Sequence, residues 1–305
     1  KAIGSADKAT GELLTNRHLL QACSISKFVA AIIALRVAER YKVDIDADIN
    51  NYLTSWHMPH TRGDEGEVNT KADAGLRGGS KLKPVSLRSL LCHQAGLLDP
   101  DDSFDSLAPG EIVPTLLEIL SGQTRLLPQP VVPVSTPYES FAYSDAGYCV
   151  IEQVLQDITG KGFPQLAEEL LFNPLGLEAS ECRFEQPLRP LRPLQPPQPR
   201  QPRPQASPPL QPHQLDSTVM QIAAKGHTPS GEVLAIGEPV YPYLAAAGLW
   251  CTASAYARVL LEVIQAAEDQ GKVLTPALVK DLFAEPGARY IGLGNFSSGL
   301  AKSPF

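Results

Sequence analysis

The 305-residue sequence has little charge and no long apolar run. Only 19% of its residues are charged, and acids outnumber bases 33 to 26, which gives a net charge of −7. A nucleic-acid-binding surface would be basic, so the sequence predicts no nucleic-acid partner. No run of 18 apolar residues occurs, so we expect no membrane-spanning helix.

The motifs of metal, disulfide and nucleotide chemistry are also missing. Five scattered cysteines without a Cys-x-x-Cys pair predict free thiols rather than a disulfide framework, and they offer no structural zinc site. Residues 57–60 read His-Met-Pro-His, but no carboxylate accompanies the two histidines, so we expect no metal there. A P-loop, a Gly-x-Gly-x-x-Gly segment and a Gly-x-Ser-x-Gly elbow are all absent. We therefore expect no cofactor.

A helix is predicted to start near Ser24 and to end near Tyr41, because apolar residues from Phe28 onward recur at the spacing of one helical face. Ser24 would lie at the N-terminus of this helix, where free N–H groups and the helix dipole favour negative charge. Lys27 comes three residues later, so the two side chains would be neighbours. Burial disfavours the charged form of an amine, and a buried amine here would activate the serine as a nucleophile.

The pair at Ser24 also has a simpler interpretation. Ser-x-x-Lys occurs again at Ser5 and at Ser80, in turn-like and loop-like stretches. Only the copy at Ser24 opens a long apolar helix, and in the alternative interpretation Ser24 is an ordinary helix N-cap.

A further segment carries a candidate residue. A short helix is predicted after Ser86, and His93 at its end is the histidine best suited to chemistry. The alternative that we favour is a buried histidine hydrogen-bonded to neighbouring backbone. Further along, Tyr143 shortly precedes a helix that has apolar residues on one face and Gly160 as its stop.

Residues 187–212 differ in kind from the rest of the chain. Eleven of these 26 residues are proline, and six of the prolines recur every third residue, which is the period of one face of a polyproline II helix. Four arginines and no acids accompany them. Such a stretch has few backbone donors and little to bury, so we expect an exposed insertion outside the fold. The sharper alternative is a docking site for a proline-binding module.

Six landmarks agree in order and spacing with one family. They are Ser24–Lys27, Leu90–Leu97, Tyr143–Tyr148, Pro174–Leu177, Ala245–Trp250 and Gly292–Gly294. Together they resemble the serine β-lactamase and penicillin-binding-protein superfamily, in its class C-like branch of β-lactamases, D-Ala-D-Ala peptidases and esterases. The resemblance covers nearly the whole chain except residues 187–212.

This resemblance implies an α+β fold in which helices flank an antiparallel sheet and an all-helical region is inserted. Residues 1–40 and 213–305 are expected to form the part with the sheet, residues 41–186 the helical part, and residues 187–212 the exposed insertion. The active site would lie between the two main parts. The resemblance also implies a periplasmic or secreted protein, and a cytoplasmic one stays open.

The resemblance further implies a serine hydrolase. Ser24 would attack a carbonyl carbon and form an acyl-enzyme, Lys27 would help to deprotonate it, and Tyr143 would act as general base and proton relay. An ammonium next to a phenol favours the phenolate, so these roles are chemically consistent. The expected partner is a small-molecule substrate, namely an ester, a β-lactam or a D-Ala-D-Ala-type amide.

The sequence departs from the family at two points. Asp145 stands where the family usually has Asn or, in some esterases, Gly; we expect it to bind substrate, and its charge would hold Lys27 protonated. The family's third motif, Lys-Thr-Gly or His-x-Gly, is absent, and we expect the chain to lack the family's terminal strands. Losing an oxyanion-hole donor on that strand costs about 10²–10³ in rate. The alternative function is therefore an impaired or non-catalytic family member with a proline-rich interaction arm.

Overall fold

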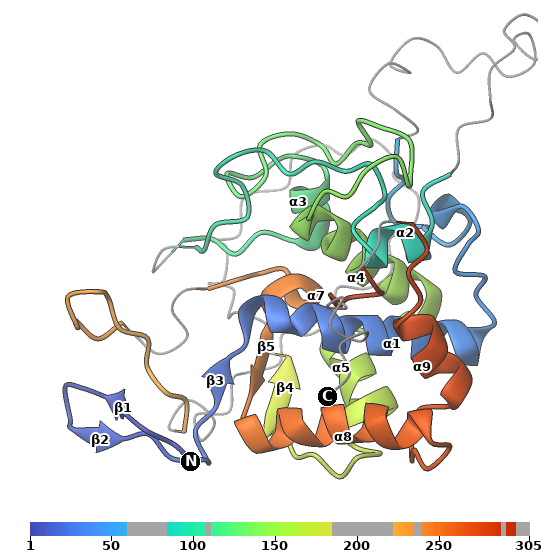
Figure 1. The fold of residues 1–305 in the computed structure, drawn as a ribbon. Helices are drawn as coiled ribbons and strands as arrows, with labels where there is room; N and C mark the ends of the chain where they lie inside the picture. Colours follow the sequence, from blue (N-terminus) through green and yellow to red (C-terminus); the bar gives the residue numbers. More distant parts are fainter. Residues whose placement is uncertain (60–83, 108–110, 185–221, 235–239, 288–290, 297–305) are drawn as a thin grey trace, which may run out of the picture.

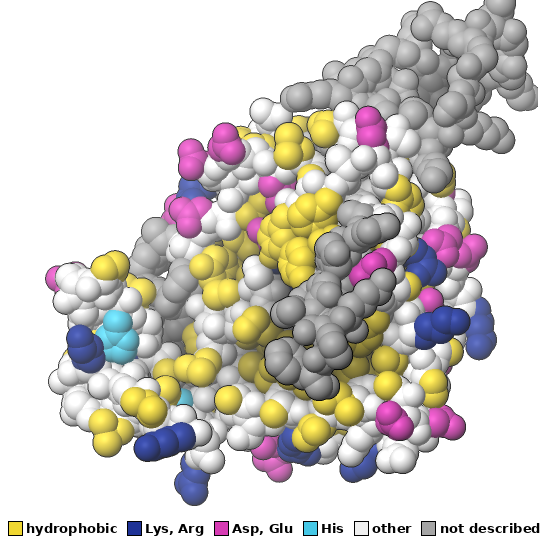
Figure 2. Space-filling model, viewed as in Figure 1, with side chains coloured by type: hydrophobic (Ala, Val, Ile, Leu, Met, Phe, Trp, Pro, Cys, Tyr) yellow, Lys and Arg dark blue, Asp and Glu magenta, His cyan; other side chains and the backbone are white. Residues whose placement is uncertain are grey.

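The computed structural model describes residues 1–59, 84–107, 111–184, 222–234, 240–287 and 291–296. The proline-rich insertion expected at 187–212, with its alternative interpretation as a docking site for a proline-binding module, lies outside the described residues. Hydrophobic side chains gather over the middle of the face shown in Figure 2, and charged side chains lie mainly toward its rim. Among the described helices, none has both the length and the apolar character needed to cross a bilayer.

Helix α1 (Ser26–Tyr41) runs through the middle of the molecule (Figure 1). Eleven of its 16 residues are buried, which is why its sequence is apolar on most sides. A short 3₁₀ turn, η1 (Cys23–Ile25), precedes it, and Lys42 ends it in the left-handed conformation. The helix predicted between Ser24 and Tyr41 is confirmed.

A three-stranded antiparallel sheet lies beside the start of α1 (Figure 1). Its strands are β3 (Leu20–Gln21), β5 (Leu249–Cys251) in the centre and β4 (Cys182–Phe184). A separate hairpin pairs β1 (Ser5–Asp7) with β2 (Glu12–Leu13). Strand β4 comes from the range 41–186 and pairs with the sheet; the division of the chain into parts stays a prediction.

The remaining helices surround α1 and are mostly short. They are η2 (Ile49–Asn51), α2 (Leu87–Leu91), α3 (Leu116–Leu120), α4 (Asp145–Thr159), α5 (Phe163–Ala167), the π-helical η3 (Glu168–Phe172), α7 (Leu244–Ala247), α8 (Ala253–Ala267) and α9 (Pro276–Leu282). Side chains of Ser144, Thr252 and Thr275 cap α4, α8 and α9. These caps satisfy N–H groups that a helix cannot pair internally. The mixture of helices and small antiparallel sheets is the predicted α+β class.

The segment 291–296 returns to the core and packs against α1. The Gly294 N–H donates to Leu91 O at 2.9 Å, and the Leu293 N–H donates to Leu282 O at 2.9 Å. Gly294 has a φ of +74°, and a Cβ there would lie 2.7 Å from Ala31 Cβ and 2.8 Å from Lys27 O. A residue other than glycine would therefore push the segment away from α1.

We expect Gly294→Ala to lower the free energy of unfolding by about 2–4 kcal/mol, because it adds overpacking to the strain of a positive φ. Gly160→Ala is the matched control, since Gly160 has a φ of +68° with nothing within 4 Å of the added Cβ. The control should lose only about 1 kcal/mol, from backbone strain alone. Urea unfolding of both variants measures the difference, and equal losses would contradict the packing argument.

Candidate active site

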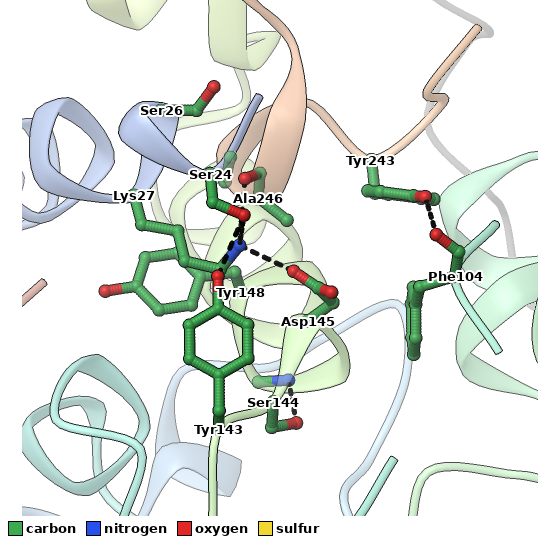
Figure 3. A network of polar contacts seen from close by, with 12 residues as sticks. Ser24, Ser26, Lys27, Phe104, Tyr143, Ser144, Asp145, Tyr148, Tyr243 and Ala246 are labelled. Atoms are coloured by element: carbon green, nitrogen blue, oxygen red, sulfur yellow. Dashed lines mark hydrogen bonds and ion pairs between the residues drawn. The ribbon is translucent and has the colours of Figure 1, made fainter. Parts of the chain in front are cut away.

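Ser24 lies in the turn η1, between strand β3 and helix α1. The turn is fixed to the central strand, because the Ala22 N–H donates to Leu249 O at 2.8 Å. Ser24 is exposed, whereas Ser26 is buried and its Oγ accepts from the Leu249 N–H at 3.0 Å. In Figure 3 the Ser26 side chain points away from Lys27 and Tyr143. Ser24 is therefore the serine of this pair that a substrate can reach.

Lys27 is buried directly beneath Ser24. Its Nζ lies 3.3 Å from Ser24 Oγ, 3.0 Å from Ala246 O and 2.5 Å from Asp145 Oδ1. The lysine side chain is only 4% exposed, and that of Asp145 is 24% exposed. An ammonium has three N–H donors and no acceptor. All three of these partners are acceptors, so the contacts match a protonated lysine.

The Tyr143 side chain also points toward Ser24 (Figure 3). Its hydroxyl donates to Ser24 Oγ at 2.9 Å. The Lys27 ammonium lies 4.9 Å from the centre of the Tyr143 ring and 5.4 Å from that of Tyr148. The Tyr148 hydroxyl instead donates to Leu91 O at 3.1 Å, away from the serine. The structure thus brings together all four predicted site residues, Ser24, Lys27, Tyr143 and Asp145.

His93 packs against Tyr143 at the edge of this cluster. It is buried, its ring stacks on Tyr143 with the centroids 4.4 Å apart, and its Nδ1 accepts from the Ser144 N–H at 3.0 Å. Burial, and then the charge of Lys27, lower the pKa of His93 from 6.5 to about 3, so the ring is neutral near pH 7. His93 is therefore the backbone-bonded, buried histidine of the favoured alternative.

Asp99 holds the start of helix α4 and was not predicted from the sequence. Its Oδ1 accepts from Ser144 Oγ at 2.7 Å, and its Oδ2 accepts from the Asp145 N–H at 2.5 Å. Ser144 Oγ in turn accepts from the Gly147 N–H and caps the helix. Burial raises the pKa of Asp99. The only sequence signal is its place two residues after the landmark that ends at Leu97.

Glu152 is a second carboxyl near the site that was not predicted from the sequence. It is buried on α4, and its Oε2 accepts from the Ala245 N–H at 2.9 Å, at the start of α7. The next residue, Ala246, provides the carbonyl that accepts from Lys27. Burial raises the pKa of Glu152 from 4.5 to about 7. An acid four residues after Tyr148, on the apolar face of the predicted helix, was the available signal.

The described residues include no group of three or more His, Cys, Asp and Glu side chains arranged to hold a metal ion. The polar groups around Ser24 are instead occupied with one another. Their arrangement offers an exposed hydroxyl, a phenol in contact with it and a buried positive charge. These are the groups that nucleophilic catalysis with acid–base assistance requires.

Comparison with known proteins gives a match over almost the whole chain. The family model described as Beta-lactamase matches residues 1–303. The teichoic acid D-alanine hydrolase of Staphylococcus aureus is 22% identical over 189 residues, which are 62% of this chain and 39% of that protein. The chain thus spans about two fifths of the length of this curated relative.

Solved structures with a similar fold cover still more of the chain. FmtA from Staphylococcus aureus has a TM-score of 0.64 at 17% identity, over 97% of this chain and 66% of FmtA. The D-amino acid amidase from Ochrobactrum anthropi, in complex with L-phenylalanine amide, has a TM-score of 0.62 at 18% identity, over 96% of this chain and 69% of the amidase. At these identities the likeness shows the fold, and it agrees with the fold expected from the sequence.

The buried carboxyl of Glu152 makes stability depend on pH. Because its pKa rises from 4.5 to about 7 on folding, its contribution is fully present below pH 4.5 and is lost as the pH rises through about 7. Glu152→Gln keeps an oxygen acceptor for the Ala245 N–H and removes the titration. We expect the stability of the wild type relative to this variant to fall by on the order of 1–3 kcal/mol across that window. Urea unfolding at several pH values tests this, and a difference that does not change with pH would contradict it.

Proposed function

The chain belongs to the β-lactamase family of hydrolases and has a β-lactamase/transpeptidase-like fold, and on this premise we propose that it is a serine hydrolase that forms an acyl-enzyme on Ser24. One observation carries the proposal. The exposed Ser24 Oγ lies 2.9 Å from the Tyr143 hydroxyl and 3.3 Å from Lys27 Nζ. A nucleophile within hydrogen-bond reach of a base, with a charged group beside both, is the pattern of an activated serine.

Tyr143 is the proposed general base. The three donors of the Lys27 ammonium all face acceptors, so Lys27 has no lone pair with which to take a proton. Tyr143 would first release its hydroxyl proton to solvent, and the resulting phenolate would accept the Ser24 proton while Oγ bonds to the substrate carbonyl carbon. The ammonium near the ring would stabilise that phenolate. Lys27 would thus assist deprotonation through its charge.

The cycle closes with the same groups. When the tetrahedral intermediate collapses, the bond to the leaving group breaks and Tyr143 returns its proton to that group, leaving the acyl group on Ser24 Oγ. Tyr143 would then take a proton from water as the water attacks the acyl carbon. The acid is released, and the proton returns to Ser24. One base serves both halves, since each half begins by removing a proton from an oxygen nucleophile.

The proposed substrate is a small ester or amide, with a β-lactam as a cyclic amide in the same class. The related proteins named above are a teichoic acid D-alanine hydrolase and a D-amino acid amidase, which favours a D-amino acid as the acyl group. Asp145 would contribute to substrate binding, because its side chain is partly exposed beside Lys27. A carboxylate there suits a substrate that carries an ammonium group.

The Lys27–Asp145 ion pair also favours a second candidate, a catalytically impaired family member. At 2.5 Å the carboxylate offsets part of the positive charge that would otherwise stabilise the Tyr143 phenolate. A non-catalytic member would use other surfaces for its role, including the proline-rich stretch outside the described residues. Direct labelling of the serine separates the two candidates.

We expect Ser24→Ala to abolish both labelling by a fluorophosphonate and the hydrolysis of a chromogenic ester, with the fold intact by circular dichroism. Ser26→Ala is the matched control, because it removes a buried hydroxyl two residues away, whose oxygen accepts from the Leu249 N–H. The control should still take up one label, and peptide mapping should place it on Ser24. Labelling of the Ser24→Ala variant, or of neither protein, would overturn the assignment.

Tyr143→Phe should slow ester hydrolysis by about 10²–10⁴, because it removes the proposed general base and leaves the ring in place. Tyr148→Phe makes the same chemical change in a ring that is also close to Lys27, but the lost hydroxyl contacts Leu91 O instead of the serine. The Tyr148 variant should lose stability and keep its rate within a few-fold. Steady-state kinetics of the two purified variants tests this, and similar rates for both would remove Tyr143 as the base.

A further inference from the structure

Two of the five cysteines meet in the sheet, although they are far apart in the sequence. Cys182 on β4 and Cys251 on β5 are directly opposite each other in the antiparallel register. Figure 1 shows the two strands side by side. Both thiols are buried, and they belong to the same face of the sheet because opposite residues of paired strands point the same way.

The hydrogen-bond pattern shows that the two cysteines form a non-hydrogen-bonded cross-strand pair, the kind in which the two residues lie closer together. The neighbouring pair, Glu181 and Thr252, is hydrogen-bonded, since the Thr252 N–H donates to Glu181 O at 2.8 Å. Hydrogen-bonded and non-hydrogen-bonded pairs alternate along antiparallel strands. Cys182 and Cys251 therefore form a non-hydrogen-bonded pair, with Cα atoms about 4.5 Å apart. Disulfides span Cα separations of about 4.4–6.8 Å.

The two sulfur atoms already interact. The interaction between the two thiols lowers the pKa of Cys251 and raises that of Cys182. Cys251 is thus the better nucleophile of the pair, since the thiolate is the reactive form. Cys92 provides a contrast, because the Gln94 amide donates to its sulfur and burial raises its pKa to about 11.

We propose that Cys182 and Cys251 are a redox-active pair that closes to a cross-strand disulfide with a small oxidant such as hydrogen peroxide. The Cys251 sulfur would attack one peroxide oxygen and break the O–O bond, giving a sulfenic acid and one water. The Cys182 sulfur would then attack the Cys251 sulfur, and the hydroxyl would leave as a second water. Two thiols are oxidised and one peroxide is reduced to two waters.

The crosslink would join two distant stretches of chain at the sheet that holds the site. Strand β5 also bonds the turn that carries Ser24, through the Ala22 N–H and Leu249 O. A disulfide between Cys182 and Cys251 would close a long loop, residues 183–250, and so restrict the unfolded chain. We therefore expect oxidation to raise the melting temperature by about 5–10 °C, a shift that reduction with dithiothreitol reverses.

The test is differential alkylation of the wild-type chain with and without hydrogen peroxide. Free thiols are blocked with iodoacetamide in denaturant, disulfides are then reduced, and the released thiols are labelled with N-ethylmaleimide. After oxidation we expect the second label on Cys182 and Cys251, and Cys92 should carry the first label throughout. Iodoacetamide on both Cys182 and Cys251, the second label on another pair, or sulfinic acid in place of a disulfide would each overturn the proposal.

Cys182→Ser and Cys251→Ser are the variant controls. Each should lose the peroxide-dependent rise in melting temperature, whereas Cys92→Ser should keep it. If a serine in the sheet prevents folding, the alkylation of the wild type still decides the question. Neither result depends on hydrolase activity, so the outcome is independent of the proposed function of Ser24.

Discussion

The site depends on the hydrogen bonds and the ion pair of the buried Lys27 ammonium. A charge taken out of water is costly unless hydrogen-bonded partners surround it. Its three acceptors come from three elements, with Ser24 in η1, Ala246 in α7 and Asp145 at the start of α4. The same contacts that stabilise the charge therefore fix these elements around the N-terminus of α1. The interactions that stabilise the buried charge of Lys27 are therefore the same ones that assemble the site.

Two carboxyls, those of the buried Glu152 and the partly buried Asp99, extend this constraint into the surrounding structure. Asp99 holds the N-terminus of α4 and so sets the direction of the Asp145 side chain. Glu152 holds the N-terminus of α7 and so sets the position of the Ala246 carbonyl. Each carboxyl accepts from backbone N–H groups that a short or capped helix cannot satisfy internally. The lysine's acceptors are thus positioned by groups that never touch the serine.

Local pattern predicted the parts of the site that lie within one turn of a helix. Ser24 and Lys27 followed from helical spacing, whereas Tyr143 and Asp145 followed from the family resemblance. Asp99 and Glu152 were not predicted, because their partners are distant in sequence and periodicity carries no information about such contacts. The pairing of Cys182 with Cys251 was not predicted for the same reason, since strand register across a long insertion is set by tertiary packing.

The contacts of Lys27 also constrain how Ser24 can lose its proton. In the present arrangement the Tyr143 hydroxyl donates to Ser24 Oγ, so the serine accepts from both the phenol and the ammonium. In the proposed mechanism Tyr143 would first lose its hydroxyl proton to solvent, and the bond would then reverse, with the serine donating and the phenolate accepting. The positive charge of Lys27 favours that reversal, and the carboxylate of Asp145 opposes it by neutralising the same charge at a shorter distance. Under the proposed function, the balance between these two neighbours of one ammonium would set how readily Ser24 becomes a nucleophile. Position 145, where the family usually has an uncharged residue, would be the point at which this chain alters that balance.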